Sequence, residues 1–169
     1  MSHILLVGFM GAGKSTVAQL VADQLNRPCV DLDRLVESVD GRTIAEIFAQ
    51  DGELTFRQLE SAALAGLSGE APSVVACGGG VVTRDENRAV LKSLGLVVYL
   101  RVTAQEMLAR VGADASRPLL GQALGATSLL DARESLYSVV ADFSVDTVCR
   151  SVESVAKEIV EFVRKRDVS

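Results

Sequence analysis

The sequence is poor in the residues that several catalytic and metal-binding chemistries require. Its 169 residues include one histidine, His3, three cysteines and no tryptophan, and aromatic side chains make up 4% of the chain. With no CxxC or Cys/His ligand spacing, this inventory excludes structural zinc and a histidine-based catalytic triad. We expect the cysteines to be reduced and mostly buried, as in a cytoplasmic protein. They are Cys29, Cys77 and Cys149.

The chain also lacks the signals of export, membrane insertion and nucleic-acid binding. No basic segment followed by an apolar region opens it, and no apolar run approaches the roughly 18 residues of a membrane span. The net charge is −5, so we expect no basic surface for nucleic acid or anionic lipid. These features predict a soluble, cytoplasmic protein whose partners are small molecules, with no nucleic-acid or membrane partner.

Apolar, β-branched segments alternate with helical patterns along the chain. Near-continuous apolar strands separated by helices predict a parallel sheet that is covered on both faces. The length suits a single domain spanning 1–169. We expect an α/β fold with three layers, α/β/α, around a five-stranded parallel sheet. The predicted strands are residues 3–7, 28–32, 73–77, 96–100 and 142–146.

Three pairs of a threonine and a glutamate predict capping boxes, in which the two side chains satisfy free N–H groups at a helix start. The pairs are Thr43/Glu46, Thr83/Glu86 and Thr103/Glu106.

The most informative motif is the stretch GFMGAGKST at residues 8–16, which fits the phosphate-binding P-loop. It follows the predicted strand 3–7 and precedes helical spacing over 17–25, which is the context that the motif requires. Backbone N–H groups in such a loop surround phosphates, and the helix N-terminus adds a positive dipole. We expect Lys14 to reach the β- and γ-phosphates of ATP and the Ser15 hydroxyl to bind Mg²⁺. The other residues expected to contact the nucleotide are Gly11, Ala12, Gly13 and Thr16. The alternative is a glycine-rich turn beside an ordinary lysine.

Two acidic residues, Asp31 and Asp33, end the second predicted strand. Strand alternation would place them on one side, at the sheet edge where ligands of open α/β sheets bind. One carboxylate could hold hydrated Mg²⁺, and the other could accept a proton from an attacking hydroxyl. Paired acids after a strand also commonly cap a helix.

Three glycines, Gly78, Gly79 and Gly80, follow the third predicted strand, where many P-loop proteins carry an acid. Since no Asp or Glu follows this strand, Asp31 is the best candidate for the carboxylate that supports the metal. The glycines would let a ligand approach backbone N–H groups closely. A flexible turn is the alternative.

Arginines outside the P-loop are candidates for binding anions in this acidic chain. Arg57 and Arg133 could form two guanidinium forks that hold a planar carboxylate, although a lone helical arginine is usually exposed. Residues 111–128 contain three glycines and a proline without a clear period. We expect a mobile lid at about 111–125 that excludes water, with Arg117 reaching the phosphates. A plain surface excursion is the alternative.

Taken together, these motifs resemble those of the shikimate kinase family over essentially the whole chain. The resemblance depends on FRxxE, GGG and RPLL in this order, because the P-loop alone marks a superfamily. The motifs are GFMGAGKST (8–16), DLD (31–33), GRTIAEIF (41–48), GELTFRQLE (52–60), GGG (78–80), RPLL (117–120) and RESLY (133–137).

The resemblance implies a P-loop kinase fold and a role for each matching residue. Asp33 would bind the hydroxyls of shikimate and activate the one that is phosphorylated. The acceptor-binding region would span about 33–60. Arg57 and Arg133 would hold the carboxylate, Gly78, Gly79 and Gly80 would supply backbone contacts, and Phe48 and Phe56 would form apolar walls.

On the nucleotide side, the resemblance implies that Ser15 binds Mg²⁺ and that Asp31 holds metal-bound water. Arg117 would contact the phosphates as a lid arginine and Arg110 would stack on adenine. Arg150 would lie in the loop on the adenine side.

The expected function is ATP-dependent phosphorylation of the 3-hydroxyl of shikimate by a monomer, a step toward chorismate and aromatic amino acids. Lys14, Mg²⁺ and Arg117 would neutralise the transferring group. Rival interpretations are a gluconate-type or other small-metabolite kinase, a nucleoside monophosphate kinase, and a nucleotide-dependent switch or regulatory ATP-binding module. A GTPase switch is disfavoured because neither asparagine, Asn26 or Asn87, lies in an NKxD motif.

Overall fold

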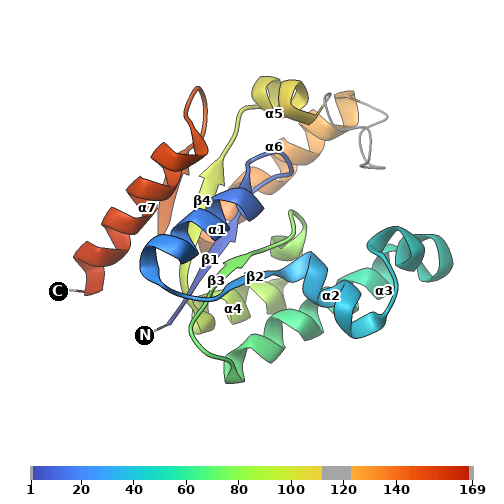
Figure 1. Cartoon of the computed structure of the whole chain (residues 1–169). Helices are drawn as coiled ribbons and strands as arrows, with labels where there is room; N and C mark the ends of the chain where they lie inside the picture. The colour runs from blue at the N-terminus through green and yellow to red at the C-terminus, as the bar shows by residue number, and fades with distance from the viewer. Residues whose placement is uncertain (1, 112–122, 168–169) are drawn as a thin grey trace.

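The computed structural model describes residues 2–111 and 123–167 and contains a five-stranded sheet (Figure 1). The strands are β1 (His3–Val7), β2 (Cys29–Asp31), β3 (Val74–Ala76), β4 (Gly95–Arg101) and β5 (Phe143–Asp146). They are ordered β2-β3-β1-β4-β5, and every neighbouring pair is parallel. The predicted α/β class and parallel five-stranded sheet are confirmed, and each predicted strand is found within about two residues of its bounds.

Helices cover both faces of the sheet, so the predicted three layers are confirmed. Helices α1 and α7 pack together on one face, and α3, α4 and α6 lie over the other (Figure 1). The bounds are α1 (Lys14–Leu25), α2 (Leu32–Asp40), α3 (Ile44–Gly66), α4 (Asp85–Leu94), α5 (Ala104–Val111), α6 (Ala123–Val140) and α7 (Val152–Asp167). Two short 3₁₀ turns, η1 (Leu67–Gly69) and η2 (Val81–Thr83), precede β3 and α4. None of the described helices is long and apolar enough to cross a membrane.

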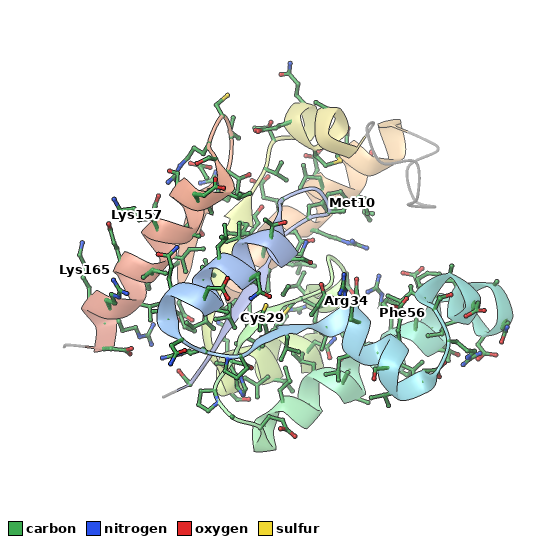
Figure 2. The ribbon with its side chains drawn as sticks, in the orientation of Figure 1. Met10, Cys29, Arg34, Phe56, Lys157 and Lys165 are labelled. Carbon is green, nitrogen blue, oxygen red and sulfur yellow. The ribbon has the colours of Figure 1, made fainter. Side chains whose placement is uncertain are left out.

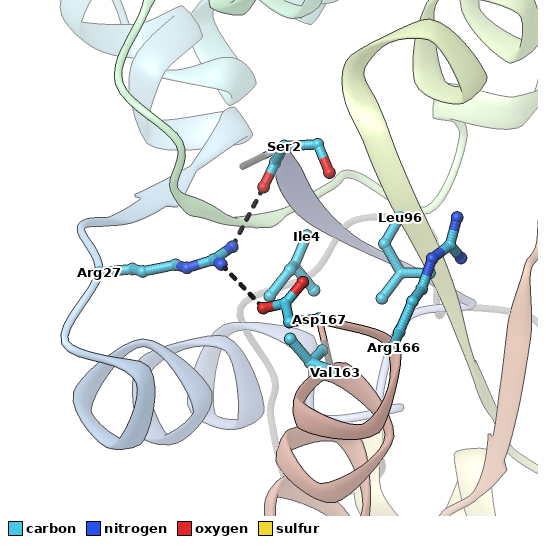
Figure 3. Close-up of a pocket in the computed structure, with 7 residues that line it drawn as sticks. All are labelled: Ser2, Ile4, Arg27, Leu96, Val163, Arg166 and Asp167. Atoms are coloured by element: carbon cyan, nitrogen blue, oxygen red, sulfur yellow. Dashed lines mark hydrogen bonds and ion pairs between the residues drawn. The ribbon is translucent and has the colours of Figure 1, made fainter. Parts of the chain in front are cut away.

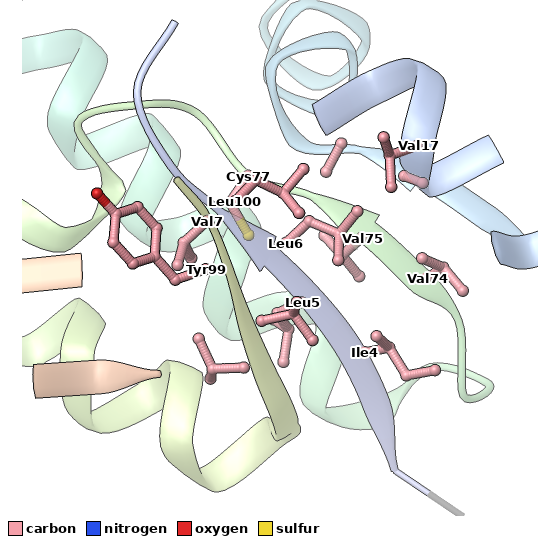
Figure 4. Packing of buried hydrophobic residues seen from close by; sticks show 14 of the residues in the cluster. Ile4, Leu5, Leu6, Val7, Val17, Val74, Val75, Cys77, Tyr99 and Leu100 are labelled. Carbon is pink, nitrogen blue, oxygen red and sulfur yellow. The ribbon is translucent and has the colours of Figure 1, made fainter. Parts of the chain in front are cut away.

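The core is centred on β1, in which all five residues are buried. Leu5, Leu6 and Val7 are completely shielded from solvent and pack against side chains of β3 and β4 (Figure 4). Because β1 has a strand on each side and helices on both faces, its apolar residues run without alternation, as expected for a central parallel strand. This rigid centre fixes the position where the P-loop begins.

The two ends of the described chain meet beside the amino end of β1. Arg27 follows α1, donates a hydrogen bond to the Ser2 carbonyl at 3.1 Å, and pairs with Asp167 at 3.8 Å (Figure 3). His3 is buried there, with Nδ1 beside the Ser73 hydroxyl and Nε2 beside the Leu67 carbonyl. The single histidine therefore has structural partners at the amino end of β1, whereas the P-loop follows the carboxyl end of the same strand.

Helix starts agree with the predicted capping boxes in one case, in part in a second, and not in a third. Thr43 and Glu46 form the complete box at the start of α3. The Thr103 hydroxyl accepts the N–H of Glu106, which is half of a box. The prediction for Thr83 is wrong, because α4 begins at Asp85 and the Thr83 hydroxyl donates to the Gly80 carbonyl instead.

Two other expectations need correction. Residues 123–128 belong to the first turns of α6 and are not part of an irregular segment; the centre of the expected lid, 112–122, lies outside the described residues. Cys77 is buried, but Cys29 is half-buried and Cys149 is exposed, so the expectation of mostly buried thiols is wrong for two of the three.

We expect Thr43→Ala to lower the free energy of unfolding by about 1 kcal/mol, because it removes the N-cap acceptor of α3. Thr55→Ala is a matched control inside the same helix, where its hydroxyl only donates back to the Asp51 carbonyl and alanine has the higher helix propensity. Urea denaturation measures both. Equal destabilisation by the two substitutions would contradict a stabilising role for the box.

Candidate active site

The P-loop joins the buried end of β1 to the start of α1 through backbone conformations that favour glycine. Gly8, Gly11 and Gly13 have φ values of 151°, 77° and 86°. A Cβ on Gly8 would lie 2.6 Å from the Leu100 carbonyl oxygen, so this position also lacks room for a side chain. The strand–loop–helix geometry predicted for residues 8–16 is therefore present.

Lys14, the first residue of α1, lies against the loop that precedes it. Its ammonium group donates to the carbonyls of Gly8 at 2.7 Å and Phe9 at 2.9 Å. A cation is thus held at the helix N-terminus, where backbone N–H groups and the helix dipole also favour an anion. This arrangement can bind phosphate.

Asp31 connects the second strand to the P-loop helix. The Ser15 hydroxyl donates to its Oδ2 at 2.7 Å, while Oδ1 accepts the N–H groups of Asp33 and Arg34. Asp31 therefore caps α2, as the alternative interpretation of paired acids has it, and its other oxygen contacts the P-loop helix through Ser15. Strand alternation does not relate it to Asp33, because β2 ends at Asp31 and Asp33 lies in the first turn of α2. The first turn of α2, and not the alternation of side chains along β2, determines the direction of the Asp33 side chain.

Asp33 and Glu60 meet at the first glycine after β3. A Cβ on Gly78 would lie 2.8 Å from Asp33 Oδ1 and 2.7 Å from Glu60 Oε1. Glycine is required here because two carboxylates, from α2 and α3, approach the backbone directly. Asp33 therefore lies beside the glycine loop that we predicted to contact the acceptor.

Arg57 packs against the last glycine of the same loop, since a Cβ on Gly80 would overlap its guanidinium. Its Nη1 donates to Glu60 at 2.8 Å and its Nη2 to Glu53 at 3.4 Å, and the guanidinium lies 5.1 Å from the centre of the Phe56 ring. Its side chain is only 13% exposed. Arg57 is thus a held, largely buried cation and not the exposed helical arginine of the alternative reading.

Glu60 also lies at this site, although we predicted no role for it beyond its place in the FRxxE motif. It is completely buried, and burial raises the pKa of its carboxyl group, while the charge of Arg57 opposes that rise. Oε1 has no hydrogen-bond partner within the described part of the chain. Its position three residues after Arg57 places both on one helix face, which is the signal that could have identified it.

Helix α6 brings Arg133 and Tyr137 to the same region from the opposite side. Arg133 is 8% exposed, and its guanidinium lies 5.8 Å from the centre of the Phe9 ring in the P-loop. The hydroxyl of Tyr137 donates to the Gly79 carbonyl. Phe9 and Tyr137 were also not predicted as site residues, because apolar and aromatic residues in a buried pattern suggest only core packing.

The predicted apolar walls belong to the helix pair that projects beside the P-loop. Phe48 and Phe56 lie with ring centroids 5.0 Å apart and pack with Val36 and Ile47 in a small separate cluster. Gly52, with φ 82° and ψ 174°, kinks α3 between the two phenylalanines. Figure 2 shows Met10 at the P-loop and Phe56 on this projecting pair.

The predicted nucleotide-side arginines have different outcomes. Arg150 is engaged by α7, where its guanidinium bonds Ser154 and pairs with Glu158 at 2.6 Å. Its loop does end beside the P-loop, because Val152 lies 3.8 Å from the Cβ position of Gly13. The side chain of Arg110 and the whole of Arg117 lie outside the described residues.

Glu106 on α5 also holds this loop, since its Oε1 accepts the N–H of Cys149 at 3.3 Å. The loop is therefore anchored to helices on both sides.

Comparison with known proteins gives consistent matches over nearly the whole chain. The family profile described as shikimate kinase matches residues 10–164. A curated shikimate kinase from Geobacter sulfurreducens is 44% identical over 168 residues, covering 96% of this chain and 91% of the relative. The solved shikimate kinase from Acinetobacter baumannii in complex with shikimate is 35% identical with a TM-score of 0.94, covering 100% and 96% of the two chains. A gluconokinase from Sinorhizobium meliloti, 18% identical with a TM-score of 0.63, covers 97% of this chain and 92% of its own, and shares the fold alone.

The buried carboxyl group of Glu60 and its ion pair with Arg57 should make the stability of the protein depend on pH. Burial raises the pKa of Glu60 in the folded protein, so folding favours the protonated carboxyl group. The stability that this protonated form contributes is full below the pKa of the unfolded chain and is lost as the pH rises through the pKa of the folded protein. Arg57→Ala removes the opposing charge, so the pKa of Glu60 should rise further. At neutral pH, where Glu60 would be left as an unpaired buried charge, Arg57→Ala should be less stable than the wild type by about 3 kcal/mol, and the difference should shrink as the pH falls into the acid range.

The double variant Arg57→Ala/Glu60→Gln provides the control, because it also removes the titrating carboxyl group of Glu60, with which Arg57 forms the ion pair. Urea denaturation from the acid range to neutral pH should show a flatter profile for the double variant than for Arg57→Ala. A profile as steep as that of Arg57→Ala would show that Glu60 is not the titrating group.

Proposed function

The chain belongs to the shikimate kinase family, and on this premise we propose that it transfers the γ-phosphoryl group of ATP to the 3-hydroxyl of shikimate. The products are shikimate 3-phosphate and ADP, a step toward chorismate and the aromatic amino acids. One observation supports this best: Asp33 and Arg57 both pack on the Gly78–Gly80 loop, directly beside the P-loop. A donor site and a charged acceptor site therefore adjoin.

The acceptor site matches a small hydroxylated carboxylate. Arg57 of α3 packs on the glycine loop, and Arg133 of α6 lies over Phe9 with its charge acting on Glu60. Two guanidinium groups can hold a carboxylate through parallel hydrogen bonds. Asp33 presents a carboxylate that can accept a hydroxyl proton. Gly79 and Gly80 supply backbone N–H groups, with Phe48 and Phe56 at the wall of the region 33–60.

The donor site holds the phosphates of ATP through the P-loop backbone, from Gly11 to Thr16, and through Lys14. The Ser15 hydroxyl and the Asp31 carboxylate fit Mg²⁺, since they are adjacent hard oxygen donors at the phosphate site. Bound Mg²⁺ would neutralise charge on the phosphates. We assign Arg117 to the phosphates and Arg110 to the adenine on the resemblance alone, and Arg150 to orienting the adenine-side loop through its contacts with α7.

Catalysis by these residues would come mainly from positioning and charge neutralisation. Asp33 holds the acceptor hydroxyl and takes its proton as the oxygen attacks. Lys14 stabilises negative charge on the transferring group. As the family resemblance implies, we propose that the enzyme acts as a monomer.

Rival acceptors have less support. The gluconokinase likeness extends only to the fold. A nucleoside monophosphate would bring a second phosphate and a base, whereas the described acceptor side offers two guanidinium groups beside two carboxylates. A pure nucleotide-binding module would give no reason for this arrangement.

The proposal predicts that ADP release depends on shikimate. A coupled ADP assay with shikimate, gluconate and AMP in parallel should show acceleration by shikimate alone. Turnover with gluconate or AMP and none with shikimate would overturn the proposed function. Acceptor-independent hydrolysis would favour a binding or switch protein.

Arg57→Lys tests the carboxylate contact without removing the charge opposite Glu60. Because lysine cannot form the bidentate fork, KM for shikimate should rise about tenfold or more, while KM for ATP stays near the wild-type value. Arg164→Lys on α7, whose guanidinium contacts the Gln24 carbonyl, is the matched control. An unchanged KM for shikimate would remove Arg57 from the acceptor site.

Asp31→Asn tests the metal assignment, because it keeps an oxygen to cap α2 and removes the negative charge. The Mg²⁺ concentration for half-maximal activity should rise about tenfold to a hundredfold. Asp23→Asn, exposed on α1, should leave it unchanged. If both variants need the same Mg²⁺ concentration as the wild type, Asp31 serves only as a helix cap.

A further inference from the structure

Tyr137 is completely buried on α6 and has two distinct contacts. Its ring stacks on Tyr99 at the end of β4, with centroids 5.0 Å apart and planes 27° apart. Its hydroxyl donates to the Gly79 carbonyl. Burial raises the pKa of its phenol, so the hydroxyl keeps the donated proton at neutral pH. The stacking accounts for a core role, but the hydrogen bond ends on a loop of the active site.

The hydrogen bond from Tyr137 to the Gly79 carbonyl also affects the next residue, Gly80, through the geometry of the peptide bond. The Gly79 carbonyl shares a planar trans peptide with the N–H of Gly80, and the two groups point in opposite directions. A hydroxyl that fixes the carbonyl therefore also fixes the direction of that N–H. The Gly80 N–H is thus aimed away from Tyr137, and the guanidinium of Arg57 packs on the same glycine.

The same glycine loop touches the P-loop. The Cβ position of Gly79 lies 3.6 Å from the Gly8 carbonyl oxygen, 3.6 Å from the Met10 nitrogen and 3.8 Å from the Tyr137 hydroxyl. Tyr137 therefore meets the loop at the point where it borders the phosphate-binding backbone. A shift of Gly79 here would change the separation of the two substrate sites.

Arg133 lies one helical turn before Tyr137 on the same face of α6. Its charge favours the ionised phenol and so opposes part of the effect of burial on the Tyr137 pKa, which places the two groups close together. A single helix face thus supplies a cation to the acceptor site and a hydroxyl to the glycine loop.

We infer that Tyr137 is a positioning residue: its hydroxyl holds the Gly78–Gly80 loop against the P-loop and thereby sets the alignment of acceptor and γ-phosphate. The inference rests on the proposed function, because it takes this loop as the acceptor wall. Tyr137 itself touches no reacting atom in this account. A small misplacement of a reactant slows the chemical step strongly. Loss of the Tyr137 hydroxyl should therefore lower the turnover of bound substrates.

Tyr137→Phe is the test, because it keeps the stacked ring and removes only the hydroxyl. We expect kcat to fall about three- to tenfold, with KM for ATP unchanged, since one positioning hydrogen bond is lost. Tyr99→Phe is the matched control: it removes a hydroxyl from the stacking partner, whose oxygen points away from the packed core around Leu5 and Leu6 (Figure 4). Its kcat should equal that of the wild type.

A spectroscopic measurement separates positioning from a general loss of structure. The chain has two tyrosines and no tryptophan, so Tyr99→Phe leaves Tyr137 as the sole tyrosine and Tyr137→Phe leaves Tyr99. Adding shikimate should change the near-ultraviolet tyrosine spectrum of Tyr99→Phe and not that of Tyr137→Phe. Equal kcat values for both variants, or equal spectral changes, would overturn the inference.

Activity of the wild type and of Tyr137→Phe distinguishes failure of the proposed function from failure of the positioning role. If the wild-type protein turns over no shikimate, the proposed function fails. If the wild type is active and Tyr137→Phe matches it in kcat, only the role of Tyr137 fails.

Discussion

The parallel arrangement of the sheet is the constraint on which the site depends. Because all five strands run in one direction, the segments that follow β1, β2 and β3 leave the same edge. These segments are the P-loop, the start of α2 at Asp31, and the Gly78–Gly80 loop. Residues far apart in the sequence are thereby placed side by side, and Asp31, at the end of the strand next to β3, contacts Ser15 of the P-loop helix.

Close packing on glycine joins the acceptor side to this edge. Gly78 admits the carboxylates of Asp33 and Glu60, and Gly80 admits the guanidinium of Arg57. The resulting cluster buries charges that are costly to bury alone, and the Arg57–Glu60 pair offsets that cost. This cluster of charged side chains thus depends on glycines that contribute no side chain of their own.

Much of this arrangement could be predicted from the sequence because its signals are local. The P-loop pattern, the strand periodicity and the Thr43/Glu46 box each lie within a few consecutive residues. The roles of Glu60 and Tyr137 were not predicted because they arise from contacts with Gly78 and Gly79, which only the tertiary fold brings near. The alternation argument for Asp33 failed because β2 ends at Asp31, one residue before the predicted bound, and the Asp31 side chain caps a helix that begins at Leu32. Arg150 was assigned by its position in a loop, but its contacts with Ser154 and Glu158 are with α7.

In the proposed mechanism, the protein aligns the γ-phosphate of ATP with a single hydroxyl of shikimate. The most direct measurement is the structure of the product after incubation with ATP, Mg²⁺ and shikimate, determined by phosphorus–proton correlated NMR. We expect the new phosphorus signal to couple to the proton on carbon 3 of the shikimate ring. Phosphorus on another oxygen, or release of inorganic phosphate with shikimate unchanged, would contradict the proposed mechanism.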